Sequence, residues 1–201
     1  YGGYSFKVNT YFPTDAYQSI VPWSVSTELL SLYTTNDLRD DIYFQSFTAG
    51  PGGVYGEKIG LNSSYGGDHG IRMAEAYLNR AEALARRFQA KGDGNDRVQA
   101  LDDLNTLRET RFATGTYVEE EVTDAQDLLD FCLNERRLEL CCEEGFRWFD
   151  IKRLGLSVTH KYIDSEGVER EYVLESNSPL YALPIPYDAI ERNYKLKQNP
   201  R

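Results

Sequence analysis

Apolar side chains recur with helical spacing through the middle of the chain. Between residues 71 and 92 they follow one another at intervals of three, four and seven, which is the spacing of one helix face. The positions on this face are Met73, Ala74, Tyr77, Ala81, Leu84 and Phe88. Gly92 is expected to end the helix, because a glycine just beyond a helix readily takes the left-handed conformation.

A second amphipathic helix is predicted over residues 96–111. Its apolar positions repeat every three residues, at Val98, Leu101, Leu104 and Leu107. Asp96 is the expected N-cap. Because only a short polar loop separates this helix from the first, the two should lie antiparallel, as a helical hairpin of the kind that stacks in helical repeats.

A third helix is predicted to begin near Thr123 or Asp124 and to continue to about residue 154. Positions at i, i+3, i+4, i+7 and i+11 form one apolar stripe on it: Leu138, Cys141, Cys142, Gly145 and Phe149. We expect its four larger side chains to be buried, and Gly145 to allow close approach of another backbone or an aromatic ring. The charged residues should occupy the opposite face, in water or in local pairs such as Glu143–Arg147 and Asp150–Arg153.

The two ends of the chain differ from this helical region. Residues 1–70 are rich in Gly, Ser, Asn and Tyr and predict a loop-rich subdomain, in which Ser26 caps a short helix with Leu29, Leu30 and Tyr33 on one face. Residues 71–201 predict the helical scaffold and an extended C-terminal segment. Within the latter, "THKYID" and "EYVLE" predict a hairpin, and two prolines precede a short helix near Asp188.

Charge and composition narrow the function classes. The chain has 201 residues and a net charge of −10, which disfavours nucleic acid as a partner. Its apolar runs are shorter than the ~18 residues of a membrane span. The three cysteines are odd in number and lack C-x-x-C spacing, so we interpret them as small buried hydrophobic residues rather than as a disulfide framework or a zinc site.

Motifs of catalysis and cofactor binding are not matched, so no cofactor is predicted. "GPGGVYGEK" misses the spacing of both a phosphate-binding loop and a dinucleotide fingerprint, and "GLSVT" lacks the final glycine of a nucleophile elbow. His69 and His160 are isolated in the sequence. The 32 acidic residues could include a glycosidase pair, but a sequence does not show their separation.

Four blocks in one order resemble a known family: "RMAEAYLNRAEAL", "ALDDLNTLRETR", "LNERRLELCCEEGFRWFDIKRLG", and "LPIPYDAIERN" with the terminal "QNP". They resemble the C-terminal half of the SusD/RagB family, surface-exposed outer-membrane nutrient-binding lipoproteins of Bacteroidetes. "STELLSLYTTNDLRDDIYF", with Asp37 and Arg39, is similar to the family as well. The family's lipoprotein signal, anchoring cysteine and long N-terminal half have no counterpart here, so we interpret the chain as a processed form or a fragment.

The resemblance implies an all-α scaffold of tetratricopeptide-like hairpins with a loop-rich subdomain. It implies a non-catalytic protein, lipid-anchored at the bacterial cell surface, that captures oligosaccharide or polysaccharide with a SusC-like TonB-dependent transporter, or in some members peptides. It also makes the stretch around Gly145 a scaffold helix, in which Phe146 and Trp148 clamp the segment that follows.

Aromatic residues of the loop-rich region are the candidate ligand contacts, since sugars stack their C–H faces on aromatic rings beside polar groups. The candidates are Tyr17, Trp23, Tyr43, Tyr55, Asn62 and Tyr65. Trp23 is the first choice, with a core role as its alternative, whereas Trp148 is expected to be structural. Three functions remain open at this point: glycan capture, peptide binding on the same scaffold, and hydrolysis by a carboxylate pair.

Overall fold

The computed structural model describes residues 25–47, 53–55, 72–143, 145–163 and 168–200. The chain divides into two compact units, Tyr1–Phe146 and Arg147–Arg201, and each is described by itself. The expected subdomain boundary at residue 70 lies outside the described residues. Helices dominate the described part, and the strands form two antiparallel pairs.

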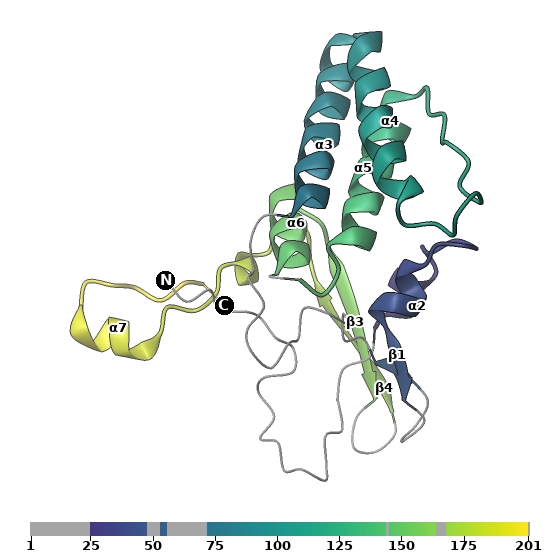
Figure 1. Cartoon of the computed structure of the whole chain (residues 1–201). Coiled ribbons are helices and arrows are strands. Elements are labelled where there is room, and N and C mark those ends of the chain that lie inside the picture. The colour runs from purple at the N-terminus through teal and green to yellow at the C-terminus, as the bar shows by residue number, and fades with distance from the viewer. Residues whose placement is uncertain (1–24, 48–52, 56–71, 144, 164–167, 201) are drawn as a thin grey trace. The chain divides into compact units, whose positions relative to one another are not determined.

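A helical hairpin forms a large part of the first unit (Figure 1). Helix α3 runs from Met73 to Lys91 and α4 from Gly94 to Glu109. Between them Gly92 has φ +70° and donates its N–H to the carbonyl of Phe88, as the predicted stop requires.

The two helices of the hairpin are antiparallel, as predicted. Arg87 pairs with Asp96 at 3.0 Å and Arg80 pairs with Asp103 at 2.5 Å, so seven residues backward along α3 match seven forward along α4. The prediction that Asp96 caps α4 is wrong. Asp93 is the N-cap, because its carboxylate accepts from the Asn95 N–H at 2.9 Å, while Asp96 is buried in its ion pair.

Helix α5, from Ala125 to Glu139, completes a three-helix layer (Figure 1). It begins where predicted, with Asp124 accepting from the N–H groups of Gln126 and Asp127. Side-chain hydrogen bonds from Gln89 to Gln126 and from Arg136 to Asn79 show that α5 runs antiparallel to α3.

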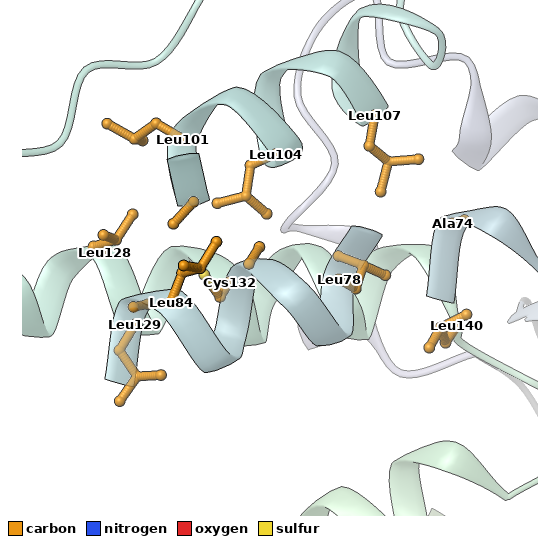
Figure 2. Packing of buried hydrophobic residues seen from close by; sticks show 13 residues of the cluster. Ala74, Leu78, Leu84, Leu101, Leu104, Leu107, Leu128, Leu129, Cys132 and Leu140 are labelled. Carbon is orange, nitrogen blue, oxygen red and sulfur yellow. The ribbon is translucent and has the colours of Figure 1, made fainter. Parts of the chain in front are cut away.

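The core of the first unit lies among these three helices, as Figure 2 shows. Ala81, Ala85 and Ala100 are fully buried, and their small side chains allow the helices to approach closely. Leu104 points from α4 toward Leu84 and Cys132 (Figure 2).

The predicted apolar faces of α3 and α4 need correction at their edges. Met73 and Val98 are exposed, at 72% and 55%, whereas Leu78 and Ala85 are buried in the core. The buried stripe of α3 therefore runs through Ala74, Leu78, Ala81 and Ala85, and Met73 lies beside it at the start of the helix.

The predicted third helix is two helices. Helix α5 ends at Glu139 and α6 runs from Phe146 to Leu154 in the sequence beyond it. Cys142 and Gly145, with φ of +58° and +78°, are left-handed, and such residues end a right-handed helix. The stripe through residue 149 is therefore wrong, because helical periodicity does not continue across the turn.

Burial along that predicted stripe changes at the turn between α5 and α6. Leu138 and Cys141 are buried, as predicted, in a small cluster with Leu29 and Phe44. Cys142 is exposed and Phe149 is 55% exposed, contrary to prediction. The positive φ of Gly145 explains why glycine is suited to this position, because other residues rarely adopt that conformation. Helical spacing in the sequence could not indicate this.

Short elements precede the hairpin. Ser26 accepts from the Leu29 N–H at 3.2 Å and so caps α1, as predicted, although α1 spans only Thr27–Leu30. Helix α2 covers Arg39–Tyr43, and strands β1 (Gln45–Phe47) and β2 (Gly53–Tyr55) pair antiparallel.

The second unit holds α6 from Arg147 onward and the predicted hairpin, whose strands are β3 (Val158–Ile163) and β4 (Glu169–Leu174). A 3-10 helix, Pro179–Tyr181, and helix α7, Tyr187–Arg192, follow. The ring of Trp148 lies 5.5 Å from that of Tyr181, so Trp148 contacts the segment that follows the hairpin. Phe146 belongs to the first unit, where the Arg136 guanidinium lies 5.4 Å from its ring.

Candidate functional site

Most of the predicted ligand contacts lie where side chains are not described. Tyr17, Trp23, Asn62 and Tyr65 are outside the described residues, and Tyr55 is described only as the last residue of β2. Their role as ligand contacts stays a prediction.

Tyr43 is the one predicted ligand contact with a described side chain. It is half-buried at the end of α2, its ring meets the edge of Phe44, and its hydroxyl lies 3.4 Å from a Glu139 carboxylate oxygen. Burial, and then the charge of Glu139, raise the pKa of Tyr43 well above its ordinary value. Tyr43 therefore stays a neutral donor toward the interior of the unit.

Glu139 is the centre of a buried network of charges. Its side chain is fully buried at the end of α5, where Arg111 donates to both carboxylate oxygens at 2.9 and 2.8 Å. Arg72 donates at 3.0 Å and Arg39 at 3.4 Å. Arg72 also donates at 3.2 Å to the backbone carbonyl of Glu139, where a cation offsets the negative end of the helix dipole.

Arg39 links this centre to the segment before α2. Its guanidinium is 1% exposed and makes a two-point contact with Asp37, at 2.9 and 2.7 Å, and a 2.6 Å contact with Glu135. Burial alone lowers the pKa of Arg39, but the hydrogen bonds and charges of Asp37 and Glu135 outweigh it and raise that pKa. Arg39 is therefore a permanent cation.

Arg108 closes the network at the end of α4. It donates to Glu135 at 2.6 Å, and its guanidinium lies 5.1 to 5.8 Å from three ring centroids. These rings belong to Phe112, Tyr117 and Phe131. The Arg108 Nε is buried without a hydrogen-bond partner, so the aromatic faces supply its electrostatic compensation.

Among the described ion pairs of the network, buried carboxylates and guanidinium groups are equal in number. Glu143 accepts from Arg72 at 2.6 and 3.1 Å, so four buried carboxylates oppose four guanidinium groups, and the exposed Glu120 also lies 3.8 Å from Arg108. The carboxylates are Asp37, Glu135, Glu139 and Glu143, and the guanidinium groups are Arg39, Arg72, Arg108 and Arg111. Such pairing is the condition under which charges are tolerated inside a protein.

The prediction that the charges of this stretch face water or pair locally is therefore wrong for Glu135 and Glu139, which are buried against arginines distant in the sequence, and Glu143 is buried against the distant Arg72. A sequence signal for the network does exist. Three carboxylates spaced four residues apart repel one another on one helix face unless cations from elsewhere compensate them. "NDLRDD" and "LRETR" supply those cations, but their proximity depends on tertiary folding.

This arrangement ties separate segments of the chain to the end of α5. Its acids are each held by arginine, and among the described residues there is no group of three or more His, Cys, Asp or Glu that could hold a metal ion. The described helices also include none long and apolar enough to cross a membrane.

The profile of the SusD family matches residues 42–201, which is most of the chain. The chain belongs to the SusD family. The predicted resemblance is thereby confirmed. Six of the eight residues of the buried charge network lie within the matched region, and Asp37 and Arg39 precede it. Proteins of the SusD family are non-catalytic binding proteins.

Two curated relatives from the SusD family are similar over part of this chain. The starch-binding protein SusD of Bacteroides thetaiotaomicron is 36% identical over 130 residues, 64% of this chain and 20% of that protein. SusD-like protein P38 of Formosa agariphila is 36% identical over 93 residues, 44% of this chain and 17% of that protein. The chain thus corresponds to only a part of each relative's length.

Solved structures confirm the predicted SusD-like fold. A SusD-like carbohydrate binding protein from Bacteroides vulgatus matches with a TM-score of 0.55 and 22% identity. A SusD superfamily protein from Parabacteroides distasonis matches with a TM-score of 0.58 and 20% identity. Each match covers 87% of this chain and 41% of the solved chain.

Proposed function

We propose that the protein captures oligosaccharide or polysaccharide nutrients at the bacterial cell surface without chemically altering them. The observation that carries this proposal is the SusD family match over residues 42–201, together with the 36% identity to a starch-binding protein. The non-catalytic character of the SusD family supports capture without hydrolysis.

The proposal includes a site and a setting. Aromatic residues of the N-terminal region, with Trp23 first among them, stack on sugar rings while Asn62 and tyrosine hydroxyls bind sugar hydroxyls. By analogy with the family, the whole protein is lipid-anchored in the outer membrane and delivers its ligand to a SusC-like TonB-dependent transporter.

Native affinity electrophoresis tests the binding. The chain is run through gels containing soluble starch or one of a panel of other polysaccharides, beside a protein of similar charge that binds none. Retardation by at least one polysaccharide supports the proposal. Binding of a peptide mixture, measured by calorimetry, with no retardation by any polysaccharide would favour the peptide-binding alternative.

A further inference from the structure

Two amide side chains close a loop at the C-terminal end of the second unit. Gln198 Oε1 accepts from the N–H of Ile185 at 2.8 Å, and Gln198 Nε2 donates to the carbonyl of Ile185 at 3.0 Å. Asn199 Nδ2 donates to the carbonyl of Leu183 at 2.6 Å. Helix α7 lies between the joined ends (Figure 1), and residues 183–199 are called the α7 loop below.

A β-turn within the α7 loop presents an aromatic ring and a cation. The N–H of Leu196 donates to the carbonyl of Asn193 at 2.9 Å, and the Asn193 side chain accepts from the N–H of Lys195 at 3.2 Å. Tyr194 and Lys195 are therefore the corner residues of the turn. Tyr194 is 88% exposed, more than any other large hydrophobic residue that the structure describes, so its ring is open to a ligand.

Positive charge gathers on the same stretch of the chain. Residues 192–201 contain four cations and no acidic residue, although the whole chain has a net charge of −10. Arg192, Lys195 and Lys197 are exposed, and none of them makes an ion pair with another described residue. The acidic residues of the α7 loop, Asp188 and Glu191, both lie on α7.

We propose that the α7 loop binds anionic polysaccharide, with Tyr194 stacked on a sugar ring and Lys195 and Lys197 bound to its carboxylate or sulfate groups. This proposal rests on the proposed function and narrows its ligand class. The ring suits the C–H face of a sugar, and each ammonium group donates to an acidic group. Because the strongly acidic remainder of the chain repels polyanions, binding of an anionic chain depends on this stretch.

The closed form of the α7 loop suits it to binding. The hydrogen bonds of Gln198 and Asn199 fix its ends, and the turn at Asn193 fixes the backbone of Tyr194 and Lys195. Less conformational freedom is therefore lost when a ligand binds than would be lost in an open chain end.

Calorimetric titration of the full chain tests the proposal. The ligands are polygalacturonate, which carries carboxylates, carrageenan, which carries sulfates, and neutral starch. Lys195→Gln/Lys197→Gln removes both lysine charges, whereas Lys195→Arg/Lys197→Arg retains them. Lys161→Gln is the control for loss of an exposed cation elsewhere in the unit, because Lys161 is already paired with Glu169 at 3.1 Å and with Glu171 at 3.0 Å.

The parent should bind at least one anionic polysaccharide more tightly than starch, and its affinity should fall as the salt concentration rises. Lys195→Gln/Lys197→Gln should weaken that binding roughly tenfold, which corresponds to about 1.4 kcal/mol, while the arginine pair and Lys161→Gln leave it within about twofold. Tyr194→Ala should weaken it as well, and Tyr194→Phe should not. A preference for polygalacturonate identifies carboxylate as the bound group, and a preference for carrageenan identifies sulfate.

Several results would overturn the proposal. Equal affinity of the parent and Lys195→Gln/Lys197→Gln for every anionic polysaccharide contradicts it, and so does binding of starch alone; in both cases the proposed function stands. Binding of no polysaccharide contradicts both. Binding of phosphatidylglycerol vesicles that is lost in Lys195→Gln/Lys197→Gln, without binding of anionic polysaccharide, assigns the loop to a membrane surface instead. Should that variant not fold, as judged by circular dichroism, equal affinities of Tyr194→Ala and Tyr194→Phe contradict the proposal.

Discussion

Removing Arg39 is the sharpest test of the buried charge network. Arg39→Met keeps an unbranched side chain of similar length but takes the cation from Asp37 and Glu135, which are 4% and 0% exposed. Breaking one partner out of a buried pair costs about 3–5 kcal/mol, because the remaining charge stays desolvated. Glu135 retains Arg108 at 2.6 Å, so most of the cost falls on Asp37.

That cost predicts a measurable shift in urea denaturation followed by circular dichroism. With a slope of about 2–3 kcal/mol per molar urea, Arg39→Met should lower the midpoint by roughly 1–2 M. As a control, Lys161→Met removes a cation from the exposed pair with Glu169 and should leave the midpoint within error.

A double-mutant cycle separates two effects of removing Arg39: loss of the attraction to Asp37, and burial of the Asp37 carboxylate without a cation. Asp37→Asn in the Arg39→Met background removes the uncompensated carboxylate and should recover part of the stability, with a coupling energy of about 1–3 kcal/mol. If Arg39→Met shifts the midpoint no more than Lys161→Met does, or if the two changes are additive, the network does not hold the fold together as argued.

Three further outcomes are expected. If Trp23 is a stacking platform, Trp23→Ala abolishes retention by polysaccharide at an unchanged melting temperature, whereas a core role predicts a stability loss of about 3–5 kcal/mol. Burial raises the pKa of the Cys132 thiol to about 12 from about 8.5 in the unfolded chain. The contribution of the neutral thiol to folding stability is therefore complete below about pH 8.5 and is lost as the pH rises toward 12. The free energy of unfolding of the parent, measured by urea denaturation, should therefore fall with pH by up to about 1.4 kcal/mol per pH unit more than that of Cys132→Ala. Equal declines in the two proteins would show that the thiol does not cause the loss. Gly145→Ala and Gly92→Ala each place an alanine in a left-handed conformation, at a cost of about 1–2 kcal/mol. A Cβ added at Gly92 would meet nothing within 4 Å, so Gly92→Ala reports the backbone strain alone. If Gly145 is closely packed, Gly145→Ala should lower the melting temperature more than Gly92→Ala does.

The helical hairpin and the start of α5 were predictable because they depend on local signals. Gly92 ends α3 and Asp124 caps α5 through contacts with residues at most four positions away. The leucines of α4 indicate a buried face by their spacing alone. The end of α5 was not predictable in this way, since the apolar spacing continues past the point where Cys142 turns left-handed.

The charge network illustrates a different limit. Glu135 and Glu139 look like solvent-facing residues until Arg39 and Arg111, from distant parts of the sequence, are brought to them. Hydrophobic periodicity does not report such pairing, because burial of a charge depends on a partner that no local window contains. The similarity to the family of the stretch that contains "NDLRDD" was one indication that Asp37 and Arg39 matter.

The central claim, capture of polysaccharide without catalysis, is tested most directly by one combined titration. The chain is titrated calorimetrically with the polysaccharide that retards it, and the same sample is assayed for new reducing ends after prolonged incubation. The account predicts saturable heat and a constant number of reducing ends. Reducing ends that increase in proportion to protein concentration, or the absence of saturable binding to every polysaccharide tested, would contradict it.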